Sequence, residues 1–282
     1  LRIRMDQDFS EYCGEGTEYK AEYAALPTGV SLLVITFTPK AASSSKTIVL
    51  IPGLASVIDN FRETVIELGR HHKVVYIETR EKGSARVDKR HKFTVDEITA
   101  DIVHFVDGRF SAGDPFVIAG YSLGATAIAE AFGRLKHKPE RIILIEPNAT
   151  FKFPGWIAVI ARFSGIIYTP LKPFLKWYMR RFRINMKEDH EMYLINCRIL
   201  DAAEPVRLGR AVRALRPYAM DGCLQAITVP AMVVVASKDM FHSHGEGSYI
   251  SERINNCTRL DMNDNKQTHS AEMGRVICDF IS

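Results

Sequence analysis

Short apolar runs alternate with amphipathic segments along most of the chain. Four runs are almost continuously apolar and end in turn-forming or polar residues: TIVLIPG (47–53), KVVYIET (73–79), PFVIAGY (115–121) and RIILIEP (141–147). Runs of this length, rich in β-branched residues, are typical of strands buried on both faces. The segments between them, 58–70, 95–108 and 123–136, have helical periodicity, and Thr94 is a plausible N-cap. The alternation predicts an α/β fold around a mostly parallel sheet with helices on both faces.

The two ends of the chain extend this pattern. Residues 17–25 and 30–38 form a predicted strand pair, joined by a turn at Pro27, Thr28 and Gly29. Near the C-terminus, 230–237 and 258–262 are predicted strands, and 270–281 is a predicted closing helix.

The alternation stops between residues 148 and 228. This segment has no convincing buried-strand run and is rich in aromatic and basic residues, as in FPGWIAVIARFSGIIYTPLKPFLKWYMRRFRI. We interpret 148–228 as a helical lid inserted into a core formed by 1–147 and 229–282. The alternative is a small helical domain without a role in function.

Composition excludes some classes of function. The 282 residues carry a formal charge of +4 that is spread along the chain, so nucleic-acid binding is not indicated. Five cysteines at irregular spacings predict reduced, mostly buried thiols of a cytoplasmic protein, and no metal or other cofactor is expected. The first residues lack the apolar stretch of a signal peptide, and no apolar run reaches the roughly 18 to 20 residues that span a bilayer.

The sequence GYSLG lies where a predicted strand turns into a predicted helix. Ser122 stands between Gly120 and Gly124, as in the nucleophile elbow G-x-S-x-G. Glycines let such a turn close because they lack a Cβ atom, and the following helix directs its first N–H groups towards the serine. The alternative is a tight turn that happens to contain a hydroxyl group.

A serine nucleophile needs a base, and the base needs an orienting carboxylate. In a parallel sheet these groups are expected after later strands, at the same carboxyl edge. Asp239 follows the run VVVAS, and His269 precedes the closing helix. Glu146, at the end of RIILIEP, is the alternative acid. His242 and His244 lie too near Asp239 in the sequence to come from a separate loop.

These segments together resemble the α/β-hydrolase superfamily over nearly the whole chain. The elbow reads GYSLG, the acid segment VVVASKDMFHSH and the histidine segment NDNKQTHSAE. The resemblance implies Ser122 as nucleophile, His269 as general base and then acid, and Asp239 as the residue that holds the imidazole.

The resemblance also implies an oxyanion hole built from two backbone N–H groups. One belongs to Leu123, and the other should come from Leu54, in the loop after IPG. Many relatives have His-Gly where this chain has Pro52-Gly53, so Ala55 remains the alternative second donor. The stretch ETREKGSAR (78–86) resembles the superfamily's Arg-x-x-Gly-x-Ser loop, and we interpret it as a structural turn beside the pocket.

The implied activity is hydrolysis of carboxylic esters through an acyl-enzyme. The preferred substrates are medium or long acyl esters, such as a monoacylglycerol or a lysophospholipid. Thioesterases and carbon–carbon bond hydrolases use the same triad, and a hydrolase-derived receptor with slow turnover is a further alternative.

The apolar and basic residues of the predicted lid bear on the substrate. Bulky apolar groups alternate there with Lys172, Lys176, Arg180, Arg181 and Arg183. One interpretation is a set of lid helices with solvated basic faces. The other is an apolar acyl-chain pocket with a basic rim that makes peripheral contact with a lipid interface.

Overall fold

A computed structural model describes residues 7–40, 46–153, 163–183, 190–237 and 244–282. Within these residues eight strands form one sheet in the order β1-β2-β4-β3-β5-β6-β7-β8. The pairs β1–β2 and β2–β4 are antiparallel, and all other neighbours are parallel. The strands are β1 (Thr17–Ala25), β2 (Ser31–Pro39), β3 (Thr47–Ile51), β4 (Lys73–Ile77), β5 (Phe116–Tyr121), β6 (Arg141–Ile145), β7 (Ala231–Val235) and β8 (Cys257–Asp261).

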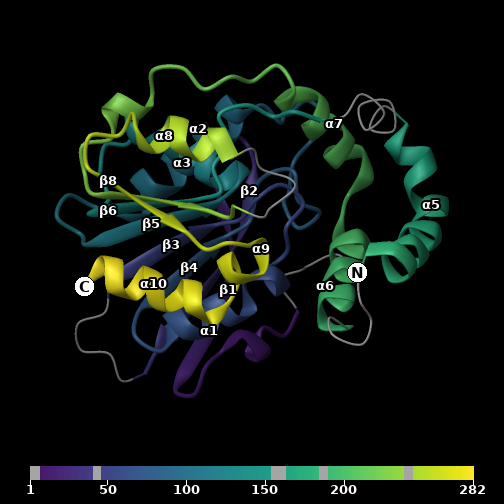
Figure 1. Cartoon of the computed structure of the whole chain (residues 1–282), viewed down its shortest axis with the longest axis horizontal. Coiled ribbons are helices and arrows are strands. Elements are labelled where there is room, and N and C mark those ends of the chain that lie inside the picture. The colour runs from purple at the N-terminus through teal and green to yellow at the C-terminus, as the bar shows by residue number, and fades with distance from the viewer. Residues whose placement is uncertain (1–6, 41–45, 154–162, 184–189, 238–243) are drawn as a thin grey trace.

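Helices cover both faces of this sheet (Figure 1). The α-helices are α1 (Arg62–Gly69), α2 (Val95–Arg109), α3 (Leu123–Phe132), α5 (Ser164–Tyr178), α6 (His190–Ala202), α7 (Pro205–Leu215), α8 (His244–Ser251), α9 (Asn265–Thr268) and α10 (Ala271–Ile281). Shorter turns are η1 (Ser10–Tyr12), η2 (Ile58–Phe61), the π-helical η3 (Met179–Arg183) and η4 (Leu224–Ala226). One apolar cluster joins α2, α3 and α8 to the sheet, and a second joins α1 and α10 to its other face.

The predicted α/β class is therefore confirmed, with differences in detail. Thr94 caps α2 as predicted, since its Oγ1 accepts a hydrogen bond of 3.3 Å from the Glu97 N–H. The predicted helix 58–70 is instead a 3₁₀ turn followed by α1, and the predicted helix 123–136 ends at Phe132. The short helices α8 and α9 were not predicted, because segments of four to eight residues carry little periodicity.

The expectation of mostly buried cysteines is wrong. All five thiols are free and half-buried. The physical reason is their position on peripheral elements: Cys257, for example, lies on β8, the last strand of the sheet.

The interval 148–228 contains α5, α6 and α7, drawn beyond one end of the sheet in Figure 1. An ion pair and several hydrogen bonds join these helices to loops that follow strands. Arg198 of α6 pairs with Asp59 in the turn after β3. Arg207 of α7 donates to the carbonyl oxygens of Lys82 (2.9 Å) and Ala85 (2.8 Å) in the loop after β4. The helices thus contact the carboxyl edge of the sheet, and their action as a lid stays a prediction.

None of the helices in the described part of the chain combines the length and the apolar character needed to cross a membrane.

Candidate active site

Ser122 occupies a strained backbone position between β5 and α3. Its φ of 49° and ψ of −112° lie outside the regions that residues with a side chain prefer. The Ser122 N–H donates to the Ile145 carbonyl of β6 at 2.8 Å, and its own carbonyl accepts from the Thr126 N–H at 3.0 Å. Such a conformation costs on the order of 1–3 kcal/mol and persists only where the surroundings enforce it, as at functional sites.

The glycines on either side make this turn sterically feasible. A Cβ atom at Gly120 would lie 2.5 Å from the Ile128 side chain and 2.8 Å from the Ala125 nitrogen. One at Gly124 would lie 2.5 Å from the Ile51 carbonyl oxygen. No side chain fits at either position, so the helix can approach the sheet and present Ser122 at the end of β5.

Backbone N–H groups suitable for an oxyanion lie beside Ser122. Leu123 is the first residue of α3, so its N–H has no acceptor within the helix. Gly53 packs against Ser122, because a Cβ atom there would lie 3.2 Å from the Ser122 Cβ. Among the described residues, no hydrogen-bond acceptor is found for the N–H groups of Leu54, Ala55 or Leu123. Unpaired N–H groups are rare in protein interiors, and these can donate to a ligand oxygen.

His269 lies next to the elbow. Its ring packs on Tyr121, the residue before Ser122, with centroids 4.9 Å apart, and on Phe61 at 5.3 Å. Its Nδ1 lies 2.9 Å from the carbonyl oxygen of Asn265. A carbonyl oxygen can only accept, so Nδ1 carries the proton and Nε2 is left as the basic nitrogen.

The two candidate acids differ in what the structure describes. Asp239 lies outside the described residues. Glu146 is buried at the end of β6 with a φ of 49°, and its Oε2 accepts from the Asn265 side chain at 3.0 Å and from Thr268 Oγ1 at 3.3 Å. Thr268 Oγ1 in turn lies 3.0 Å from His269 Nδ1. Glu146 therefore anchors the segment that carries His269.

Asn148 also contacts Ser122, and the sequence did not indicate it as a candidate site residue. Its side-chain amide donates to Ser122 Oγ at 3.0 Å. Its backbone is held by Thr126, whose Oγ1 accepts from the Asn148 N–H (2.9 Å) and donates to the Asn148 carbonyl (3.0 Å). No motif marks this residue, and only the pairing of β6 with β5, which places Ile145 opposite Tyr121, could have indicated it.

Comparison with known proteins gives matches at the level of structure alone. No family model and no curated protein sequence matches the chain. An enol-lactonase from Burkholderia xenovorans LB400 superposes with a TM-score of 0.74 at 20% identity, over 92% of this chain and 99% of its own.

Two esterases match in the same way. The thermophilic esterase from Thermogutta terrifontis has a TM-score of 0.73 at 15% identity, over 93% of this chain and 98% of its own. The esterase from Exiguobacterium antarcticum has a TM-score of 0.75 at 11% identity, over 92% of this chain and 98% of its own. With the strand order and the serine turn at the end of β5, these matches show that the chain has the α/β-hydrolase fold.

Proposed function

We propose that the protein is a serine hydrolase that cleaves carboxylic esters through an acyl-enzyme. The observation that carries the proposal is Ser122, held in a strained turn at the N-terminus of α3 with His269 packed beside it. A hydroxyl group is a weak nucleophile, and this arrangement supplies a base and donors for developing negative charge.

The proposed reaction has two half-reactions. His269 Nε2 takes the Ser122 hydroxyl proton while Oγ attacks the ester carbonyl carbon, and the oxyanion is bound by the N–H groups of Leu54 and Leu123. The imidazolium then protonates the leaving alcohol, and an acyl-enzyme remains. Water next attacks the acyl carbon and gives a proton to His269. The imidazolium returns this proton to Ser122 Oγ as the bond between Oγ and the acyl carbon breaks, so the carboxylic acid leaves and Ser122 is restored. Asp239 would stabilise the imidazolium in both halves.

Asn148 prepares the nucleophile for the first step. Because its amide donates to Ser122 Oγ, the hydroxyl oxygen is the acceptor in this contact, and the hydroxyl group donates its own proton in another direction. We infer that this hydrogen bond directs the hydroxyl proton towards His269.

We propose medium or long acyl esters as substrates because of the residues that are exposed on helix α5 and on the turn after it. Ile166 of α5 is 79% exposed, and Phe174 and Trp177 are exposed as well. Arg180 and Arg181 are exposed in η3, at the end of this helix. Lys172 and Lys176 of α5 pair with Asp201 at 3.8 Å and 2.7 Å and add two further cations to this surface. Exposed apolar groups beside cations favour contact with an anionic lipid surface.

Turnover of p-nitrophenyl esters of graded chain length tests the proposal. We expect measurable hydrolysis that rises with acyl-chain length, and a loss of about 10³-fold or more in kcat in Ser122→Ala. Ser10→Ala, at the exposed start of η1, is a matched control and should leave kcat unchanged. Hydrolysis that survives in Ser122→Ala would contradict the proposal.

A further inference from the structure

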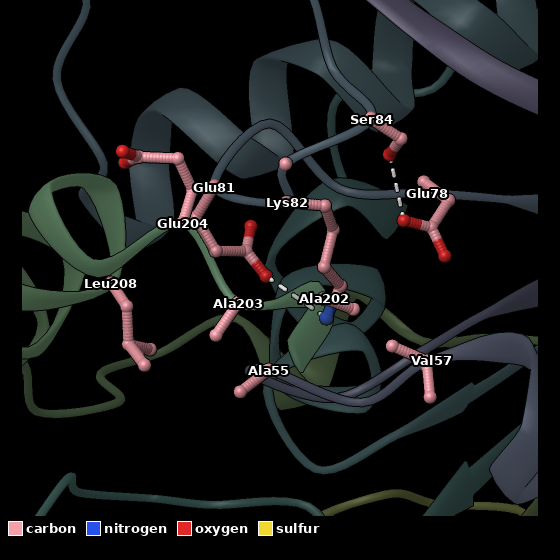
Figure 2. Close-up of a pocket in the computed structure, with 11 residues that line it drawn as sticks. Ala55, Val57, Glu78, Glu81, Lys82, Ser84, Ala202, Ala203, Glu204 and Leu208 are labelled. Atoms are coloured by element: carbon pink, nitrogen blue, oxygen red, sulfur yellow. Dashed lines mark hydrogen bonds and ion pairs between the residues drawn. The ribbon is translucent and has the colours of Figure 1, made fainter. Parts of the chain in front are cut away.

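A buried cluster of charged side chains lies behind the loop that follows β3. Glu78, Glu81 and Lys82, from the loop after β4, line a small cavity together with Ala55 and apolar groups from the end of α6 (Figure 2). The cavity is small: the centre of a water molecule can occupy a volume of about 20 Å³ in it. The side chains of Glu81 and Lys82 are only 1% and 5% exposed. Charged side chains are rarely buried to this degree unless they are paired or hydrogen-bonded.

Lys82 is held in one place by its neighbours. Its Nζ lies 3.2 Å from Glu81 Oε1, which also accepts from Thr79 Oγ1 at 2.7 Å. The Lys82 backbone is fixed by two hydrogen bonds, one from its N–H to the Thr79 carbonyl (3.0 Å) and one from Arg207 to its own carbonyl (2.9 Å). The ammonium group is therefore fixed in position before any substrate binds.

The Lys82 ammonium group also donates to the carbonyl oxygen of Gly53. This carbonyl belongs to the same peptide unit as the N–H of Leu54, and in a planar trans peptide the two point in opposite directions. The Ser56 N–H donates to the same oxygen at 3.3 Å, in a turn closed by the positive φ of Ala55. Because the Gly53 carbonyl oxygen points towards Lys82, the Leu54 N–H of the same peptide points away from Lys82.

We propose that Lys82 is the positioning residue of the oxyanion hole: it fixes and polarises the Gly53–Leu54 peptide so that the Leu54 N–H, rather than that of Ala55, is the second donor. A cation at the carbonyl oxygen withdraws electron density from the peptide and strengthens the N–H as a donor. Donors that are fixed before charge develops contribute most to catalysis. The loop 78–86 then acts on the chemistry through a backbone group instead of serving only as a turn.

The inference rests on the proposed ester hydrolysis, so it is tested in a background where Ser122 is known to react. Removing Lys82 alone would leave the buried carboxylate of Glu81 without its cation, which destabilises proteins strongly. We therefore compare Glu81→Gln with the double variant Glu81→Gln/Lys82→Met. Lys138→Met is the matched control, since the Lys138 ammonium group also donates to a backbone carbonyl, that of Phe132, far along α3 from the elbow.

The readouts separate positioning from general damage to the fold. Loss of a whole oxyanion donor lowers kcat about 10²- to 10³-fold, and we expect Lys82→Met in this background to lower it about 10- to 100-fold. Inhibition by an acyl trifluoromethyl ketone, whose adduct with Ser122 carries the oxyanion, should weaken by the same factor. KM and inhibition by the product acid should change by less than about threefold, and Lys138→Met should change none of these values.

A nuclear magnetic resonance measurement on the intact protein gives a second test. Gly53-Leu54 is the only Gly-Leu pair in the sequence, so labelling glycine carbonyl carbon and leucine nitrogen selects this single peptide. The Leu54 amide proton should move downfield when the trifluoromethyl ketone binds, and the Gly53 carbonyl carbon should shift in Lys82→Met relative to its Glu81→Gln parent.

The outcomes distinguish this inference from the function beneath it. An unreactive Ser122 in the wild type overturns the proposed function. If Ser122 is reactive, any one of three results overturns the role of Lys82 alone. The first is an unchanged kcat in the double variant, and the second is a change in KM and product inhibition as large as the change in kcat. The third is a Leu54 amide proton that does not shift when the ketone binds.

Discussion

At the scale of single residues, the sequence reveals a site residue when a local backbone requirement marks it. Ser122 was predicted because Gly120 and Gly124 flank it, and a crowded turn requires glycine at these positions. The structure shows that crowding, and the turn gives Ser122 its φ of 49°. Asn148 and Lys82 act through contacts between segments 26 and 29 residues apart, and nothing in their own neighbourhood indicates a partner. Contacts of this kind can be recognised only once the pairing of the strands in the sheet is known.

The choice of acid is a prediction at this scale. Asp239→Asn should reduce kcat by about 10⁴-fold while the fold is kept, because an amide would stabilise the wrong imidazole tautomer. Glu146→Gln should be much milder, since Glu146 anchors Asn265 and Thr268 rather than carrying the charge of the reaction. Steady-state kinetics of the two variants, with circular dichroism for folding, makes the comparison. A larger loss in Glu146→Gln would move the acid to the end of β6.

Asn148→Ala tests the hydrogen bond to Ser122 Oγ. A neutral hydrogen bond contributes about 1 kcal/mol, so we expect kcat/KM to fall about fivefold. The effect should appear in the rate of acylation measured in a stopped-flow burst, because the bond orients the hydroxyl group before attack. A variant that reacts at the wild-type rate would show that this amide has no part in preparing the nucleophile.

At the scale of elements, the loop after β4 is tied to α2 by a buried guanidinium group. The fully buried Arg80 side chain donates two hydrogen bonds to Asp101, at 2.6 Å and 2.7 Å, and one to Glu97 at 2.6 Å. The sequence pattern predicted α2 and the loop separately but not their ion pairs. These pairs hold the loop that carries Lys82 against the body of the protein.

Asp101→Asn should lower the free energy of unfolding by about 3 kcal/mol, since it leaves buried positive charge only partly compensated. Asp96→Asn is the matched control on the same helix. Asp96 pairs with Arg134 at 2.6 Å, but both side chains are exposed, so its loss should cost less than about 1 kcal/mol. Urea unfolding of both variants measures the difference, and equal losses would refute the special role of Arg80.

The cations after α5 are tested by replacing Arg180, Arg181 and Arg183 with Gln. Each cation near an anionic membrane contributes on the order of 1 kcal/mol, screened by salt. We expect weaker binding to vesicles of anionic phospholipid and slower hydrolysis of ester dispersed in them, with unchanged turnover of a short soluble ester. Gln at the exposed Arg253, Arg259 and Arg275 removes the same charge elsewhere and should have little effect on vesicle binding. If vesicle binding changes neither with salt concentration nor with these substitutions, the proposed substrate class loses its support.

At the scale of the whole molecule, the alternation of apolar runs and amphipathic helices was sufficient to predict the α/β fold. Runs such as RIILIEP are buried on both faces, and that requirement leaves a characteristic sequence pattern. The antiparallel pairing of β2 with β4 depends on contacts between distant strands, which no local pattern encodes. The same holds for the docking of α6 and α7 on the carboxyl edge of the sheet.

The buried Glu78 gives a pH dependence of stability. Burial raises the pKa of this carboxyl group from its ordinary value of 4.5, so the folded chain holds the proton more tightly than the unfolded chain. Its contribution to stability is therefore present below pH 4.5 and is lost as pH rises through the folded-state pKa. Glu78→Gln should gain stability over the wild type as pH rises in this range, as measured by urea unfolding at several pH values.

Asp88 provides the opposite case. Hydrogen bonding from the Arg90 N–H lowers the pKa of this exposed carboxyl group, so its contribution to stability is lost as pH falls. The stability difference between Asp88→Asn and the wild type should thus change with pH in the opposite sense to that of Glu78→Gln. If the stability differences of both variants from the wild type changed with pH in the same direction, the argument that burial raises the pKa of Glu78 would be contradicted.

The most direct test of the central claim is the identification of the residue that an active-site phosphonate modifies. Peptide mass spectrometry of the wild type treated with a fluorophosphonate should find one adduct, on Ser122, that forms more slowly in the presence of a competing acyl ester. Ser122→Ala should give no adduct. Modification of another residue, or an unmodified Ser122 in folded protein, would contradict the account of this protein as a serine hydrolase.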